Sequence, residues 1–303
     1  MIDAPPPAAR PRFVRAAGMR VATFTFGSDA SAAPPVLLLH GLAHWTHAAW
    51  GRVLPHLDPQ RLYVAFDLPG FGASDKPDVR YDAQLFRCAV DDVAAAYACG
   101  PFALVGHSLG GFVAAAVAGA QPSRVTRLAL IAPAGFARTP HHLALGLAAT
   151  FARRVFDYAP SRELIAWILE RGVADRAALD PDEVARAHEL AQDVAMRRAF
   201  AAVYRSAVDV FARRSELHAE FARYRGPVLC AWGTRDRYIP VRAVRQVRAV
   251  YPRAEIVLLD RSGHLPSIEE PARLGAVLRR FLAEDDAASC EPAGDAGGAT
   301  TLG

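Results

Sequence analysis

Residues 106–111 read Gly106-His107-Ser108-Leu109-Gly110-Gly111, a serine with a glycine two positions away on either side. The apolar run Phe102 to Val105 comes directly before this motif, and a helical pattern of small apolar residues continues after it to Ala120. A serine on a tight strand-to-helix turn takes strained backbone angles, and only small residues two positions away leave room for the turn. The N-terminus of the following helix favours negative charge beside the serine. The motif therefore predicts a nucleophilic Ser108, with Gly106 and Gly110 as turn glycines.

Further short apolar runs recur along the chain and alternate with helical patterns. Continuous apolar runs of this kind suit strands buried on both faces, as in a parallel sheet. The alternation predicts a doubly wound, mostly parallel α/β sheet, whose ligands bind beyond the carboxyl ends of the strands. The other expected strands are Val21–Phe26, Val36–Leu39, Leu62–Phe66, Leu128–Ile131, Val228–Trp232 and Ile256–Leu259. The expected helices include Ala83–Tyr97, Gly110–Ala120, Val241–Val250 and Pro271–Leu282.

One long stretch, 139–224, interrupts the alternation because it carries helical patterns and no strand signal. It is too long for an ordinary crossover between strands. We expect an inserted helical cap over the carboxyl edge of a core formed by 19–138 and 225–285, with the cap setting specificity. The ends of the chain, 1–18 and 286–303, have little apolar surface to bury and are expected to be disordered tails.

A serine hydroxyl becomes a strong nucleophile only beside a base that a third group orients. His264 is the candidate base, because it follows the last expected strand and a glycine and is the sole histidine in the last fifth of the sequence. Asp236 is the candidate acid, because it stands just past the strand Val228–Trp232. The chain order is thus serine, aspartate, histidine, with the expected cap in the long first gap.

Two other carboxylates follow strands and compete for the role of the acid. Asp260 lies four residues before His264 and is expected to cap its own loop. Asp67 opens a glycine-rich segment and is expected to hold that turn. No carboxylate follows the strand that ends at Ile131, where the sequence continues Ala-Pro-Ala-Gly. Asp236 is therefore the preferred acid.

An oxyanion formed by attack on a carbonyl needs two backbone N–H donors. The amide of Leu109, next to the serine, is one candidate, and the amide of Leu42, in an earlier strand-end loop, is the other. The histidines of that loop, His40, His44 and His47, raise the question of a metal site. His44 and His47 are three residues apart, but no carboxylate or third ligand is fixed nearby in the sequence, so we expect a pocket rim or the start of a helix here and no metal.

Composition excludes several classes of function. The sequence has 35 lysines and arginines against 31 acidic residues, a net charge of +4, without a concentrated basic patch, so we expect no nucleic-acid partner. No apolar run approaches the roughly 18 residues of a membrane span, and the N-terminus lacks the apolar core of a secretory signal. We expect a cytoplasmic protein without stable membrane insertion, either a monomer or a homodimer.

Together these motifs resemble the α/β-hydrolase superfamily over about residues 19–284, with the cap as the poorly matched part. Family members that are haloalkane dehalogenases or epoxide hydrolases carry aspartate at the nucleophile position, so Ser108 argues against both. The resemblance implies a Ser-His-Asp hydrolase that needs no cofactor. The motifs that carry it are His40-Gly41, Asp67-x-Pro69-Gly70-x-Gly72-x-Ser74, the 106–111 motif, Trp232-Gly233-x-x-Asp236 and Gly263-His264.

The implied reaction is hydrolysis of ester-type bonds in small, largely apolar substrates through an acyl-enzyme. The resemblance leaves open a hydrolase of carbon–carbon bonds in ring-cleavage products, a lactonase and a thioesterase. A ligand-binding receptor on the same fold is the non-enzyme alternative, which the intact triad disfavours. A few apolar side chains of the cap are expected to line the pocket, and most to pack on one another: Phe151, Phe156, Tyr158, Trp167, Ile168, Leu169, Phe200, Tyr204 and Phe211.

Overall fold

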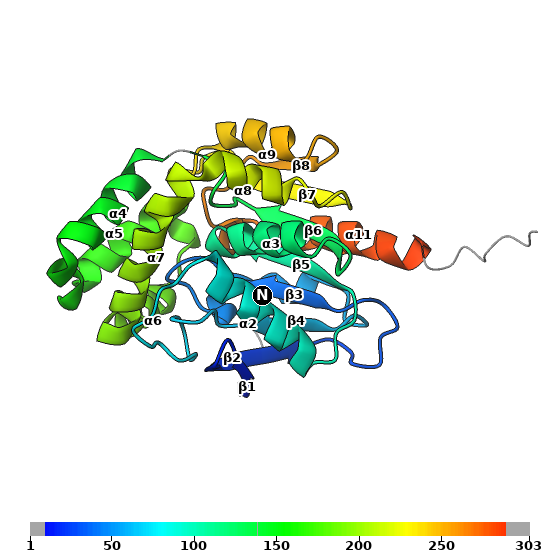
Figure 1. The fold of residues 1–303 in the computed structure, drawn as a ribbon, viewed down its shortest axis with the longest axis horizontal. Helices are drawn as coiled ribbons and strands as arrows, with labels where there is room; N and C mark the ends of the chain where they lie inside the picture. Colours follow the sequence, from blue (N-terminus) through cyan, green and yellow to red (C-terminus); the bar gives the residue numbers. More distant parts are fainter. Residues whose placement is uncertain (1–9, 138, 289–303) are drawn as a thin grey trace, which may run out of the picture.

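The computed structural model describes residues 10–137 and 139–288, and its centre is a sheet of eight strands in the order β1-β2-β4-β3-β5-β6-β7-β8 (Figure 1). β1 pairs antiparallel with β2, and β2 with β4, whereas every neighbouring pair from β4 to β8 runs parallel. This confirms the predicted doubly wound, mostly parallel α/β sheet. The strands are β1 (Arg12–Ala16), β2 (Met19–Phe26), β3 (Val36–Leu39), β4 (Tyr63–Phe66), β5 (Phe102–His107), β6 (Val125–Ile131), β7 (Val228–Gly233) and β8 (Glu255–Leu259).

Alternate residues of the central strands point into two cores, one on each face of the sheet. In β3, Leu37 and Leu39 belong to the larger core, whereas Val36 and Leu38 belong to the smaller one. Side chains alternate along a strand, so a strand covered by helices on both faces is apolar at every position. The larger core is covered by α2 (Ala83–Ala96), α3 (Leu109–Ala120), α8 (Arg214–Phe221) and α9 (Val244–Val250). The smaller core is covered by α1 (Thr46–Trp50) and α11 (Pro271–Ala288). Shorter elements are η1 (Leu54–His56), η4 (Val241–Ala243) and α10 (Pro266–Glu269).

Between β6 and β7 the described residues form helices and no strand. Four of these helices gather at one end of the sheet, at the left of Figure 1, and two 3-10 turns lie between them. We call this group the insert: α4 (Pro140–Phe151), η2 (Arg153–Asp157), α5 (Arg162–Gly172), η3 (Arg176–Ala178), α6 (Pro181–Ala191) and α7 (Val194–Ala212). Among the helices of the two described ranges, none is long and apolar enough to cross a bilayer.

The fifth helix of this stretch, α8, packs on the core although it falls within the predicted cap, 139–224. The ring of Phe221 lies 5.8 Å from that of Phe112 in α3. Backbone atoms of Glu220 lie so close to Gly119 that a Cβ there would overlap them. α8 is thus the crossover helix that returns the chain to β7.

The prediction of a disordered tail over 1–18 is wrong for Arg12–Ala16, which forms β1. Val14 and Ala16 are buried, and Arg15 between them is exposed. Ala17 and Gly18 take positive φ angles of 50° and 75°, as the tight turn of a hairpin requires. Alternation over so few residues, with arginines in between, gave too weak a strand signal. The predicted tails otherwise fall mostly on 1–9 and 289–303, which lie outside the described residues, and α11 extends to Ala288.

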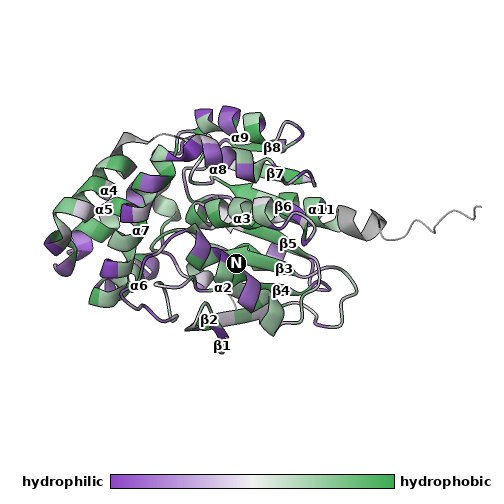
Figure 2. Ribbon diagram, viewed as in Figure 1, coloured by the Kyte–Doolittle hydropathy of each residue, from purple (hydrophilic) through white to green (hydrophobic). Residues whose placement is uncertain are grey.

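Figure 2 shows where the apolar sequence lies in this arrangement. The central strands are consistently hydrophobic, whereas the helices of the insert carry apolar and polar residues side by side. The side chain of Phe151, at the end of α4, is 84% exposed, and that of Trp167 in α5 is 55% exposed. The core is therefore sealed by helices on both faces, and part of the apolar surface of the insert faces outward.

Candidate active site

Ser108 lies between β5 and α3, where its backbone is held at a φ of 52° and a ψ of −112°. Residues other than glycine rarely adopt such angles, so the surrounding packing must impose them. A Cβ on Gly106 would overlap the carbonyl of Gly110, and a Cβ on Gly110 would overlap the carbonyl of Leu39. Glycine is therefore required on both sides of the serine, and the tight turn presents its side chain at the N-terminus of α3.

The structure brings the three predicted triad residues together from three different loops. Ser108 Oγ lies 3.0 Å from His264 Nε2, and His264 Nδ1 lies 2.8 Å from Asp236 Oδ2. An ionised carboxylate only accepts hydrogen bonds, so Nδ1 carries the proton of the neutral ring and Nε2 accepts the hydrogen of the serine. Both side chains behind the serine are buried: His264 is 8% exposed and Asp236 is 7% exposed. This arrangement can take a proton from the serine hydroxyl.

The carboxylate of Asp236 is held in place by donors besides His264. Its Oδ1 accepts from the amides of Tyr238 and Ile239, both at 2.8 Å. Its Oδ2 also accepts from the indole N–H of Trp232, at 3.2 Å. These bonds leave the carboxylate little freedom to turn away from the histidine, so they fix the orientation of the imidazole.

His107, the residue before the serine, contacts His264, and the sequence did not reveal this contact. Its Nε2 donates to the backbone carbonyl of His264 at 2.8 Å, and the two rings lie 4.9 Å apart. Burial holds the pKa of His107 well below its usual value, so the ring is neutral. The one signal in the sequence is that a histidine stands at the variable position between Gly106 and Ser108.

The loop that carries Leu42 packs directly against Ser108. A Cβ on Gly41 would lie 3.3 Å from the Cβ of Ser108. His40 fixes this loop, because its Nδ1 donates to the carbonyl of Gly41 at 2.7 Å and its Nε2 accepts from the amide of Leu68 at 2.8 Å. The amide of Leu109 is the first of α3, a position whose N–H has no partner within the helix. Both predicted oxyanion donors thus belong to segments beside Ser108, and their role stays a prediction.

The rival carboxylates lie elsewhere. Asp67 accepts from the amides of Thr46 and Ala73, both at 2.8 Å, and so holds the turn as predicted. The side chain of Asp260 is 73% exposed and pairs with Arg273. Neither carboxylate bonds His264 in the described residues, which leaves Asp236 as the acid that the geometry favours.

The described part of the chain holds no group of three histidine, cysteine or acidic side chains that could bind a metal ion. Both ring nitrogens of His40 bond to the backbone, as described above. Burial lowers the pKa of His44 to about 3, so this ring is also neutral. His40 therefore supports the loop, and His44 is buried within it.

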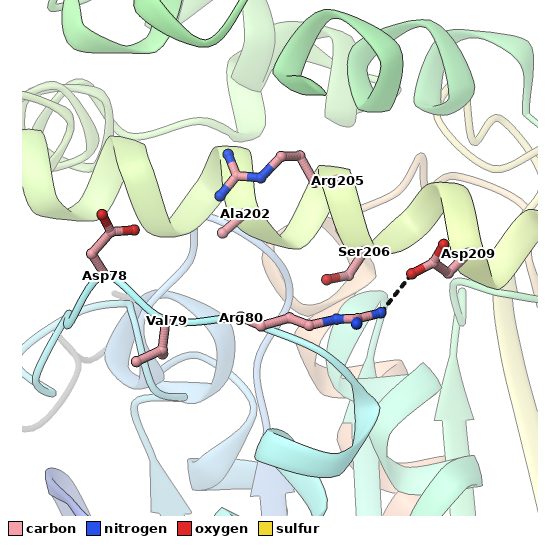
Figure 3. A pocket seen from close by; sticks show the side chains of 7 residues that line it. All are labelled: Asp78, Val79, Arg80, Ala202, Arg205, Ser206 and Asp209. Atoms are coloured by element: carbon pink, nitrogen blue, oxygen red, sulfur yellow. Dashed lines mark hydrogen bonds and ion pairs between the residues drawn. The ribbon is translucent and has the colours of Figure 1, made fainter. Parts of the chain in front are cut away.

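Most of the apolar insert residues singled out from the sequence meet one another or solvent. The rings of Phe156 and Phe200 lie 6.2 Å apart, and those of Phe200 and Tyr204 lie 4.9 Å apart. A hollow of about 370 Å³ opens between residues 78–80 and α7, with the Arg80–Asp209 ion pair at its edge (Figure 3). Ser108 does not line this hollow, so it is separate from the candidate active site.

Comparison with known proteins gives one family and several relatives. A family model described as alpha/beta hydrolase fold matches residues 34–271. A 2-hydroxymuconate semialdehyde hydrolase from Pseudomonas sp. (strain CF600) is 29% identical over 287 residues, which cover 92% of this chain and 95% of that protein. A 2-hydroxy-6-oxo-2,4-heptadienoate hydrolase from Pseudomonas putida is 26% identical over 267 residues, covering 85% and 92%. The solved enol-lactonase from Burkholderia xenovorans LB400 has a TM-score of 0.76 at 19% identity, covering 90% of this chain and all of that one, a likeness of fold alone.

Proposed function

Since this chain belongs to the alpha/beta hydrolase fold family, we propose that it hydrolyses ester-type bonds of small, largely apolar substrates through an acyl-enzyme on Ser108. The observation that carries the proposal is the hydrogen-bonded series from Ser108 Oγ through the His264 ring to Asp236. A positive φ at the serine and a buried acid–base pair behind it are costly features for a purely structural turn.

The proposed reaction has two halves. Ser108 Oγ attacks the carbonyl carbon while His264 Nε2 takes its proton, and the amides of Leu42 and Leu109 donate to the oxyanion. His264 then passes the proton to the leaving alkoxide, which departs as the alcohol. Water, deprotonated by the same nitrogen, attacks the acyl-enzyme and releases the acid and the free serine. Asp236 stabilises the imidazolium in both halves.

Every group in this scheme comes from one chain, so a monomer or a homodimer suffices and no cofactor takes part. The substrate in this proposal is a small molecule, which the hydrolase family and the two Pseudomonas relatives support. A cytoplasmic location, as the sequence predicts, belongs to the same proposal.

A second candidate is hydrolysis of a carbon–carbon bond beside a carbonyl. It is favoured by the two relatives named as hydrolases of 2-hydroxymuconate semialdehyde and of 2-hydroxy-6-oxo-2,4-heptadienoate. In this version the leaving group is a carbon that must be protonated as the bond breaks, whereas an ester releases an oxygen. Ser108, His264 and Asp236 keep the same positions in both candidates.

The deciding experiment treats the purified protein with a fluorophosphonate probe and then compares two substrate types. Labelling at Ser108 that is lost in His264→Ala would support an activated serine. Hydrolysis of p-nitrophenyl hexanoate at a higher kcat/KM than 2-hydroxymuconate semialdehyde would favour the ester proposal, and the reverse order would favour the second candidate. A preference for p-nitrophenyl acetate over longer esters would contradict the proposed preference for largely apolar substrates. No labelling of the folded protein would refute both candidates.

A further inference from the structure

The end of α5 is bonded to both loops that carry the acid and the base. The amide of His264 donates to the carbonyl of Gly172 at 2.6 Å. The hydroxyl of Tyr238 donates to the carbonyl of Ile168, also at 2.6 Å, while the amide of the same tyrosine donates to Asp236. The insert therefore reaches the acid–base pair through its backbone.

Glu269 completes this connection from the other side. Its Oε1 accepts from the amide of Ala174 at 2.6 Å and from that of Asp175 at 3.1 Å. Its Oε2 accepts from the amide of Gly263 at 2.6 Å. A single half-buried carboxylate thus bonds the segment after α5 and the residue directly before His264. Burial raises the pKa of Glu269 despite these amides, so the carboxylate is held in a place that opposes its charge.

The two backbones that Glu269 joins are in direct contact. A Cβ on Gly263 would lie 2.6 Å from the carbonyl oxygen of Gly172, so only glycine allows this approach. Just beyond it, Val173, Leu265 and Ile268 form a small buried cluster of their own. Residues 168–175 are therefore packed onto the histidine loop by hydrogen bonds, close backbone contact and apolar burial together.

We propose that residues 168–175 of the insert hold His264 in line with Ser108, with Glu269 as the positioning residue of this contact. The inference rests on the proposed function, in which His264 is the base. Glu269 touches neither Ser108 nor the ring of His264. It acts through the backbone amide of Gly263, and the position of this residue fixes the position of the His264 backbone and hence of its imidazole. The end of α5 is then part of the support of His264.

The test is Glu269→Gln, which keeps the size of the side chain but replaces one acceptor oxygen with an NH₂ donor. An amide has a single acceptor oxygen, so it cannot serve both segments. We expect kcat to fall about 10- to 100-fold while KM changes less than about threefold, because a misplaced base slows chemistry more than binding. We also expect faster hydrogen–deuterium exchange in both 172–176 and 262–266. The control is Asp260→Asn, which removes the same charge from an exposed side chain near the loop and should change neither measurement.

Hydrogen exchange separates the failure of this inference from the failure of the proposed function. Wild-type exchange at either segment in Glu269→Gln, or an unchanged kcat, would overturn the positioning role even when Ser108 reacts with the fluorophosphonate probe. An unreactive Ser108 in wild-type protein would refute the function, and exchange would still decide whether Glu269 joins the two segments. If Glu269→Gln loses its near-UV circular dichroism, Tyr238→Phe serves as a second variant, because it removes the hydrogen bond from the acid loop to the carbonyl of Ile168. Faster exchange at 168–173 with a lower kcat then supports the inference, and no change overturns it.

Discussion

Ser108 and His264, the proposed nucleophile and base, are held in place by different means. Ser108 is fixed mainly by steric constraint, because its backbone angles are strained and its two flanking glycines leave no room for a Cβ. His264 is fixed by partners distant in the sequence, among them His107, which is 157 residues away, and Gly172 of the insert. Steric constraint of this kind persists in any folded molecule, whereas a set of hydrogen bonds can be weakened one bond at a time. A conformational change in the insert is therefore expected to shift His264 more than Ser108.

The largest expected effect comes from removing the nucleophile itself. Ser108→Ala should lower kcat by about 10⁴- to 10⁶-fold, because the acyl-enzyme can no longer form. The backbone turn does not depend on the hydroxyl, so the midpoint of thermal unfolding should stay close to wild type. Esterase assays and differential scanning calorimetry check the two parts. Activity within tenfold of wild type would refute the triad assignment.

Asp236→Asn should have the next largest effect, because it acts on the base side alone. The asparagine amide can present a donor to Nδ1 and so favour the wrong tautomer of His264. We expect kcat to fall about 10³- to 10⁴-fold while the protein remains folded. A loss below tenfold would show that the other contacts of His264 suffice to orient it, and the comparison between the two sides would have to be revised.

Much of the site could be predicted because its residues stand at the ends of apolar runs. Ser108, Asp236 and His264 each follow a run that proves to be a strand, and parallel strands bring their carboxyl ends to one edge. The glycine pattern around Ser108 also carries its steric reason in the sequence. In these cases the local pattern and the tertiary position agree, so a strand boundary is enough to place the residue.

The remaining parts could not be predicted because their partners are far away in the sequence. Glu269 and His107 bond to backbone atoms, and nearly every residue type offers the same backbone N–H and carbonyl, so the sequence does not indicate these partners. The place of α8 is a similar case: its sequence predicts a helix, but nothing in it says that Phe221 meets the core rather than the insert. Which residues of the insert face the substrate depends on the packing angles of its helices, which periodicity alone does not give.

On the nucleophile side, Gly110→Ala should disturb the site through packing. The added Cβ would overlap the carbonyl of Leu39, so the turn must open. We expect a loss of about 1–3 kcal/mol in the free energy of unfolding and a 10- to 100-fold slower reaction of Ser108 with the fluorophosphonate probe. Gly100→Ala is the matched control, because a Cβ there meets nothing within 4 Å and should change stability by less than about 0.5 kcal/mol. If both variants had the same stability and the same labelling rate, steric constraint would not be what holds Ser108 in place.

The smallest expected effect concerns the neutral histidines around the serine. Burial lowers the pKa of His40, His44 and His107 below the usual 6.5, to about 3 for His44. Below pH 6.5 the unfolded chain therefore binds more protons than the folded one, and the free energy of unfolding must fall as the pH falls through this window. Each histidine can contribute up to about 1.4 kcal/mol per pH unit, so His44→Gln should make the decline between pH 6.5 and 5 shallower by up to that amount. Urea denaturation at several pH values measures the slope. An equally steep decline in His44→Gln would mean that this ring becomes protonated without unfolding, and that the nucleophile side is less tightly packed than its glycines imply.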